Sequence, residues 1–241
     1  MKKAIAAVLA LVTVLSAFCA CSIPGVTATT QVKYKKLENE AVVTELPSAT
    51  GITEIVIADE YEGLPVTEIK DFAGCNLEYA EKITIGKNVK TIGSWAFTNN
   101  QRLKEFSVDG ENPYFCAVDG VLYTKDMTVL LSCPCGGLAM YEIPEGVEKI
   151  RSKAFYKCGR LEKLTVPSTL GCIEEKAFFR CERLKNIELP DGLERIEKDA
   201  FGYCIQLSEI VIPKTVAEML VALRMEQKAT MEALGSEYHD Y

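Results

Sequence analysis

An exact internal repeat is the feature of this sequence that most limits how the chain can fold. Three segments share one pattern, an isoleucine followed four positions later by an Ala-Phe pair, and they begin at Ile150, Ile173 and Ile196, a period of 23. Other residue types recur at the same interval: Cys158, Cys181 and Cys204; Leu161, Leu184 and Leu207; Pro144, Pro167, Pro190 and Pro213. A unit this small cannot bury its own apolar side chains, so identical units must stack into one continuous core.

The same frame continues upstream in weaker copies. Ile69 and Ile92 keep the repeat interval, but the step from Ile92 to Ile150 is more than twice as long, so extra sequence separates these two units. Within it, Asp119-Gly120 stands between apolar runs, a pattern typical of a hairpin turn. Residues 115–133 therefore predict a small three-stranded meander that leaves the stack.

Each unit combines a short strand with a turn. In the segment before Pro167, Leu164 alternates with Lys163 and Thr165, which is the period of a strand. The Ile-to-Cys part is too short for a stable helix and predicts one tight helical or bent turn. We expect an α/β solenoid with one parallel sheet of about seven short strands, which end near Ile57, Ile85, Val108, Ile143, Val166, Leu189 and Ile212.

The repeat motif, Ile-x-x-x-Ala-Phe-x-x-Cys-x-x-Leu with a proline after the strand, resembles the BspA-like leucine-rich repeat family. The resemblance covers about residues 46–219, and the block 112–123 is similar to the hairpin insertion common in that family. It implies a leucine-rich repeat solenoid, which we place at 32–214 with the insertion at 109–137. It also implies a bacterial surface protein, since the better-known members bind host matrix or plasma proteins and other bacterial surfaces.

The N-terminus is typical of an export signal, because two lysines precede an uncharged, Ala/Val/Leu-rich stretch that runs to Ala20. Ala20-Cys21 resembles a bacterial lipoprotein box, in which the cysteine becomes the N-terminus and carries the lipids. We predict a signal peptide at 1–20, lipid attachment at Cys21 and a flexible tether over 21–31. Ordinary cleavage, giving a secreted protein, and an uncleaved anchor stay open, and all three place the rest outside the cytoplasm.

Residues 215–241 predict a C-terminal capping helix and tail. Thr215 and Glu218 have the spacing of a capping box. Apolar residues follow at helical spacing: Val216, Met219, Leu220 and Leu223. A helix over about 216–234 would cover the apolar edge of the last repeat, although it could instead dock on a partner or a membrane.

Charge and residue usage exclude several functions. A net charge of -7 without a long basic run opposes binding to nucleic acid. His239 is the single histidine, which excludes a multi-His metal site and a Ser-His or Cys-His nucleophile pair. We therefore expect no cofactor, no metal and no enzyme, with a carboxylate- or thiol-based enzyme as a remote alternative.

Cysteine is abundant, with ten in the chain. Cys158, Cys181 and Cys204 occupy one repeat position and should form a column with a spacing of about 4.8 Å. The Cβ atoms of a disulfide lie only about 3.8 Å apart, so we expect these three thiols to be buried and reduced. Cys116, Cys133 and Cys135 lie in the insertion, where one disulfide could form, but the sequence does not decide which.

The outward positions of the strands form two columns across the sheet. The first contains Glu54, Lys82, Glu105, Met140, Lys163, Asn186 and Glu209, and the second contains Val56, Thr84, Ser107, Glu142, Thr165, Glu188 and Val211. Solenoid faces are common binding surfaces, so the candidate binding face is Lys82, Thr84, Glu105, Ser107, Met140, Glu142, Lys163, Thr165, Asn186 and Glu188. An ordinary ladder of salt bridges is the alternative.

Together these features favour an exported, membrane-tethered, adhesin-like module that binds a host or envelope protein or a glycan. The membrane would be contacted only through the lipid anchor, and a monomer is expected. The alternative is a structural or assembly scaffold of the bacterial envelope.

Overall fold

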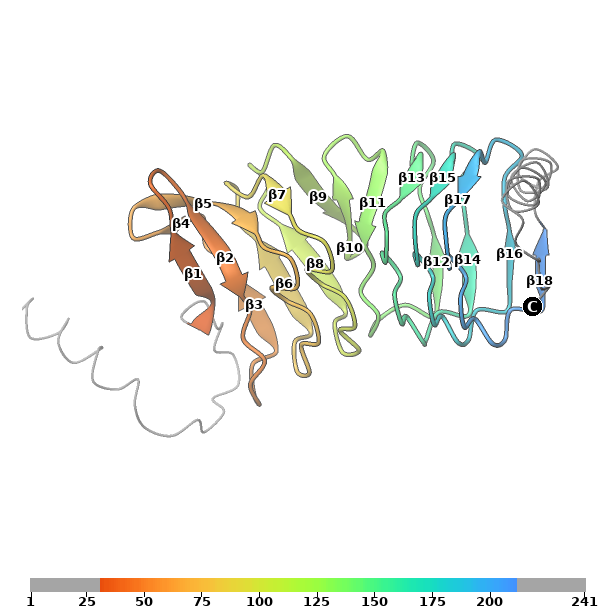
Figure 1. Cartoon of the computed structure of the whole chain (residues 1–241), viewed down its shortest axis with the longest axis horizontal. Helices are drawn as coiled ribbons and strands as arrows, with labels where there is room; N and C mark the ends of the chain where they lie inside the picture. Colours follow the sequence, from red (N-terminus) through yellow and green to blue (C-terminus); the bar gives the residue numbers. More distant parts are fainter. Residues whose placement is uncertain (1–30, 212–241) are drawn as a thin grey trace, which may run out of the picture.

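The computed structural model describes residues 31–211, which form an elongated β-solenoid (Figure 1). The strands of successive turns lie side by side along its long axis. The expected signal peptide and most of the tether, and the capping helix after residue 214, lie outside the described residues. Between residues 31 and 211 the chain contains no α-helix, so the expected α/β class is wrong for this part of the protein.

The strands at the expected repeat positions form two parallel sheets. The first has three strands, β3 (Glu54–Val56), β6 (Lys82–Ile85) and β8 (Glu105–Val108). The second has four, β12 (Met140–Glu142), β14 (Lys163–Thr165), β16 (Asn186–Glu188) and β18 (Glu209–Val211). The expectation of one continuous sheet is therefore wrong.

The insertion is the reason for this division. The amide of Phe106 in β8 donates to the carbonyl of Gly120 at 2.8 Å, and the amide of Gly136 donates to the carbonyl of Leu103 at 2.7 Å. A Cβ on Gly136 would lie 2.5 Å from the carbonyl carbon of Arg102, so only glycine permits this backbone approach. Segments of the insertion thus form hydrogen bonds with the backbone in and next to β8, and β12 does not pair with β8.

A second row of strands lines the opposite side of the solenoid and was not expected. It contains β13 (Lys149–Ile150), β15 (Cys172–Ile173) and β17 (Arg195–Ile196), each ending at the repeat isoleucine. In the N-terminal part the corresponding sheet contains β1 (Lys33–Lys36), β2 (Ala41–Glu45), β5 (Leu64–Ile69) and β4 (Glu60–Tyr61), with β7 (Thr91–Ile92) paired to β5. The strands at the repeat isoleucines, β7, β13, β15 and β17, have two residues each and are too short to show an alternating pattern, so periodicity could not reveal them.

The insertion contains the expected meander of β9 (Phe115–Val118), β10 (Val121–Thr124) and β11 (Val129–Ser132). Both of its pairings are antiparallel. It does not leave the stack, however, because β11 pairs in parallel with β13 and so continues the second sheet. Leu122, Tyr123 and Leu130 are completely buried, and this burial fixes the meander within the core.

The Ile-to-Cys segment of each repeat forms a turn held by contacts to the next repeat. Two residues per turn have a positive φ, for example Lys153 (φ 62°) and Lys157 (φ 59°). A left-handed residue at these points prevents an α-helix. The amide of Phe155 donates instead to the carbonyl of Ala177 at 2.8 Å, and that of Phe178 donates to Ala200 at the same distance.

The repeat phenylalanines form the core of the C-terminal half, as expected. Phe155 and Phe178 are completely buried, with ring centroids 4.9 Å apart, and Phe201 continues the stack at 5.1 Å from Phe178. A second buried cluster fills the N-terminal half around Ile55, Ile83 and Phe106. These two clusters form the cores on which the strand sheets of the two halves pack.

Candidate binding surface

Four of the ten candidate residues lie on the N-terminal sheet, where they pair with one another. Lys82 lies opposite Glu105, and Thr84 opposite Ser107. The ammonium group of Lys82 forms an ion pair with the Glu105 carboxylate. The hydrogen bond to Glu105 raises the pKa of Lys82, and all four residues are half-buried. On this face the salt-bridge ladder is the better description, since the cation is already neutralised.

The other six candidate residues lie on the C-terminal sheet, and all are exposed: Met140, Glu142, Lys163, Thr165, Asn186 and Glu188. Met140 and Asn186 flank Lys163 on the neighbouring strands, and Glu142 lies opposite Thr165. Among the described residues Lys163 forms no ion pair, and 70% of Met140 is exposed. This face therefore presents a cation beside an exposed apolar side chain.

A shallow groove of about 520 Å³ lies along β14 and β16 on this sheet. Four of the candidate residues line it: Lys163, Thr165, Asn186 and Glu188. At its rim the hydroxyl of Ser168 donates to the Glu145 carboxylate at 3.1 Å, which fixes an acidic edge. The two expected columns are confirmed within each sheet, but the insertion divides the ten residues into two separate groups.

The opposite sheet carries a second groove, of about 880 Å³, that the sequence analysis missed. Its two cationic side chains have partners: Lys149 lies 3.6 Å from Glu174, and Arg195 lies 3.2 Å from Glu197. Arg195 also donates to the Cys172 sulfur at 3.3 Å, and this contact raises its pKa. The charged pairs Glu148-Lys149 and Glu194-Arg195, each just before a repeat isoleucine, were the available signal. Because both cations are already paired, this groove is the weaker candidate.

The turn side carries a row of aromatic rings that was also missed. It contains Phe72, Trp95, Tyr156, Phe179 and Tyr203, with neighbouring centroids 5.8, 5.5, 5.5 and 5.1 Å apart. Lys153 lies over the Trp95 ring at 3.8 Å. Each ring packs on its neighbours in the row, and Phe72 and Tyr203 at the two ends are exposed, so we assign the row to packing between repeats.

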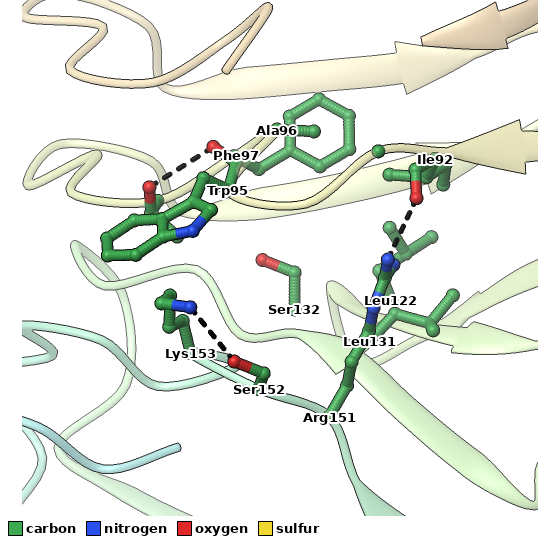
Figure 2. A pocket seen from close by; sticks show the side chains of 12 residues that line it. Ile92, Trp95, Ala96, Phe97, Leu122, Leu131, Ser132, Arg151, Ser152 and Lys153 are labelled. Carbon is green, nitrogen blue, oxygen red and sulfur yellow. Dashed lines mark hydrogen bonds between the residues drawn. The ribbon is translucent and has the colours of Figure 1, made fainter. Parts of the chain in front are cut away.

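A small cavity marks the junction between the N-terminal repeats and the rest of the solenoid (Figure 2). The Arg151 guanidinium reaches across it and donates to the carbonyl of Ile92 at 3.0 Å. Burial lowers the pKa of Lys153, whose ammonium group also donates to the Ser152 hydroxyl at 3.1 Å. The volume of about 20 Å³ holds one water molecule at most, so this is a structural seam and no ligand site.

The cysteine column is present and is longer than expected. Cys158 and Cys181 are buried as predicted, and burial raises the pKa of each thiol, whereas Cys204 is only half-buried. Cys135 lies one repeat interval before Cys158 and belongs to the same column, which the analysis of the insertion overlooked. In the described part of the chain no cluster of His, Cys, Asp or Glu has the arrangement of a metal site.

The parallel strands recur at a fixed interval, and non-helical turns join them around a column of phenylalanines. This arrangement defines a leucine-rich repeat β-solenoid. The chain belongs to the BspA type leucine rich repeat family, whose repeat region matches it in six copies over residues 48–115 and 133–221. The unmatched residues 116–132 are the meander. Repeat modules of this family are interaction scaffolds and are generally found at the cell surface.

Two solved structures show the same fold. The pneumococcal vaccine antigen PcpA is 31% identical, with a TM-score of 0.63, and the match covers 68% of this chain and 46% of that protein. A leucine-rich repeat protein from Eubacterium ventriosum is 20% identical, with a TM-score of 0.57 and coverage of 69% and 56%. The matched region thus spans about half the length of these relatives.

Among curated proteins no match is found. Within the described residues no helix has the length and apolarity needed to cross a membrane.

Proposed function

We propose that this protein is an exported cell-surface binding module, tethered to the membrane through a lipid on Cys21, that recognises a protein or glycan. Membership of a surface-protein repeat family supports export and binding. The N-terminal sequence supports the tether, although Cys21 lies outside the described residues. No catalytic step is part of the proposal, since members of this family typically act as scaffolds.

The face of β12, β14 and β16 is the observation that carries the proposal. It combines the cation of Lys163 with the exposed side chain of Met140 and the polar groups of Thr165 and Asn186. The strand backbones are fixed in register, so little conformational entropy is lost when a partner binds. The N-terminal sheet is less suitable because Lys82 and Glu105 already satisfy each other.

The charge of Lys163 suggests what the partner offers there. A cation on an acidic chain attracts an anionic group locally, against the overall repulsion of the protein. Met140 adds apolar contact beside it, and the groove along β16 adds hydrogen-bonding groups. A protein segment or glycan with a carboxylate or sulfate beside apolar surface fits this arrangement.

A capture experiment tests the proposal. The immobilised full chain is presented with host matrix proteins, a glycan array and an extract of envelope proteins from the same cells. Lys163→Glu should weaken binding of the captured partner by about tenfold or more. It should leave stability within about 0.5 kcal/mol, as exposed charge changes usually do.

The matched control exchanges the two charges of the ion pair on the N-terminal sheet, Lys82→Glu with Glu105→Lys, and so keeps an ion pair at that place. Binding should be unchanged in this control. Loss of binding in the control with none in Lys163→Glu would move the surface to the N-terminal sheet. Capture of envelope proteins alone would instead favour a role in envelope assembly.

A further inference from the structure

Three thiols meet where the insertion rejoins the regular repeats. Cys133 and Cys135 follow the last strand of the meander, and Cys158 lies on the turn of the first full repeat. All three side chains are buried. The sulfur of Cys135 lies 2.8 Å from the sulfur of Cys158, well inside the usual contact distance of two sulfur atoms.

The next two cysteines of the column provide an internal comparison. The Cys181 thiol donates to the carbonyl of Phe155, and the Cys204 thiol donates to the carbonyl of Phe178, each at 3.1 Å. These contacts suit a protonated, reduced thiol. For Cys158 the nearest carbonyl contact, to Cys133, is 3.9 Å long, and its close neighbour is the Cys135 sulfur.

The backbone around Cys135 explains why this pair differs from a regular column. Cys135 lies between Pro134 and Gly136 in a turn, and the amide of Gly136 donates to the carbonyl of Leu103 at 2.7 Å, so the backbone here does not follow the turn of a regular repeat. At the same time, the amide of Cys133 donates to the carbonyl of Ala154 at 2.8 Å, which holds the two turns together. The parallel spacing that keeps thiols of regular repeats too far apart for a disulfide therefore does not hold for this pair.

We propose that Cys135 and Cys158 form a disulfide when the protein folds in an oxidising environment. The two sulfurs need to approach by less than about 1 Å to reach the bonded distance. Such a bond would join the end of the insertion to the first full repeat within the C-terminal core. Cys181 and Cys204 stay reduced.

The oxidant is a disulfide that exchanges with thiols. The thiolate of one cysteine attacks a sulfur of that disulfide, forms a mixed disulfide and releases one thiolate of the oxidant. The thiolate of the second cysteine then attacks the protein sulfur of the mixed disulfide, and the Cys135–Cys158 bond forms as the second oxidant thiolate leaves. Two electrons and the two thiol protons pass to the oxidant, which becomes a pair of thiols. Because both thiols are buried in the folded chain, exchange must occur before the turns close.

The test is refolding of the denatured full chain with oxidised and reduced glutathione, followed by alkylation in denaturant without reductant and peptide mapping. Cys158 lies between Lys157 and Arg160, so trypsin separates it from Cys135. Fragmentation before Pro134 then distinguishes Cys133 from Cys135. We expect one linked pair, Cys135 with Cys158, lighter by two hydrogen atoms, and alkylated Cys181 and Cys204.

Alkylated Cys158, or Cys158 linked to Cys133 or Cys181, would overturn the proposal. Two variants provide a second measurement, the difference in urea midpoint between oxidised and reduced protein. Cys133→Ala should keep the higher midpoint of the oxidised form, and Cys135→Ala should lose it. The opposite result would assign the bond to Cys133. The outcome is independent of any ligand, so it does not depend on the proposed binding function.

Discussion

Truncation of Phe178 should be the most damaging single change in the described core. Its ring is completely buried and stacks between Phe155 at 4.9 Å and Phe201 at 5.1 Å. Phe178→Ala removes the buried ring, at a cost of about 3–5 kcal/mol. The loss of two ring–ring contacts, each about 0.5–1.5 kcal/mol beyond area burial, places the value in the upper part of that range.

The assay is urea unfolding of the variant beside the parent chain, with amide hydrogen exchange to locate the damage. Since each repeat contacts only its neighbours, protection should fall first in the turns around Ala177 and Ala200, whose carbonyls accept hydrogen bonds from neighbouring repeats. Tyr203→Ala is the matched control, because Tyr203 is 64% exposed and truncation of its side chain should cost far less.

A cost below about 2 kcal/mol for Phe178→Ala would refute the reasoning. It would mean that neighbouring repeats collapse into the vacated space or that the phenylalanine stack does not hold the repeats together. Equal costs for Phe178→Ala and Tyr203→Ala would have the same meaning, since burial would then not decide the stability of this column.

Two further predictions concern the N-terminus and a buried pair of tyrosines. Cys21→Ala should release the chain from the membrane fraction, and mass spectrometry of the parent should find a lipid adduct on Cys21 and no peptide from residues 1–20; a variant that stays membrane-bound and uncleaved would contradict the lipoprotein assignment. The hydroxyls of Tyr123 and Tyr141 lie 2.5 Å apart, and burial raises the pKa of Tyr141 to about 12. Because the folded pKa lies above the unfolded value of about 10, stability should be full below pH 10 and fall as pH rises towards 12. Urea midpoints across this range should show the fall, and a double Tyr→Phe variant should lack that component.

For the candidate binding face, the repeat interval predicted which residues are neighbours but not which of them form ion pairs. The repeat interval placed Lys163 beside Met140 and Asn186 correctly, because residues at one repeat position must lie in register when units stack. It also placed Lys82 beside Glu105. Sequence could not tell which cation is already paired, since that depends on side-chain conformation and on where the insertion breaks the sheet.

For the thiols too, the repeat interval predicted the column but not every contact within it. The interval identified a column through Cys158, Cys181 and Cys204, and the buried state of the first two is confirmed. Cys135 was assigned to the insertion, although it lies on the column, because the point where the chain rejoins the stack was placed too late. Only the fold brings its sulfur to 2.8 Å from that of Cys158.

By itself the sequence determined that this chain stacks short repeated units, which residues face the core and which lie beside each other on the strand face. These follow because a small unit must bury its isoleucine, phenylalanine and leucine against identical neighbours. The tertiary structure decided that the strands at the expected repeat positions form two sheets, that a second row of strands lines the opposite side, and that the meander joins the stack. Those features depend on backbone hydrogen bonds between segments far apart in the chain, such as Gly120 with Phe106 and Gly136 with Leu103. Every residue except proline carries the same backbone donor and acceptor, so the partners of these groups are set by the fold and cannot be read from the periodicity of residue types.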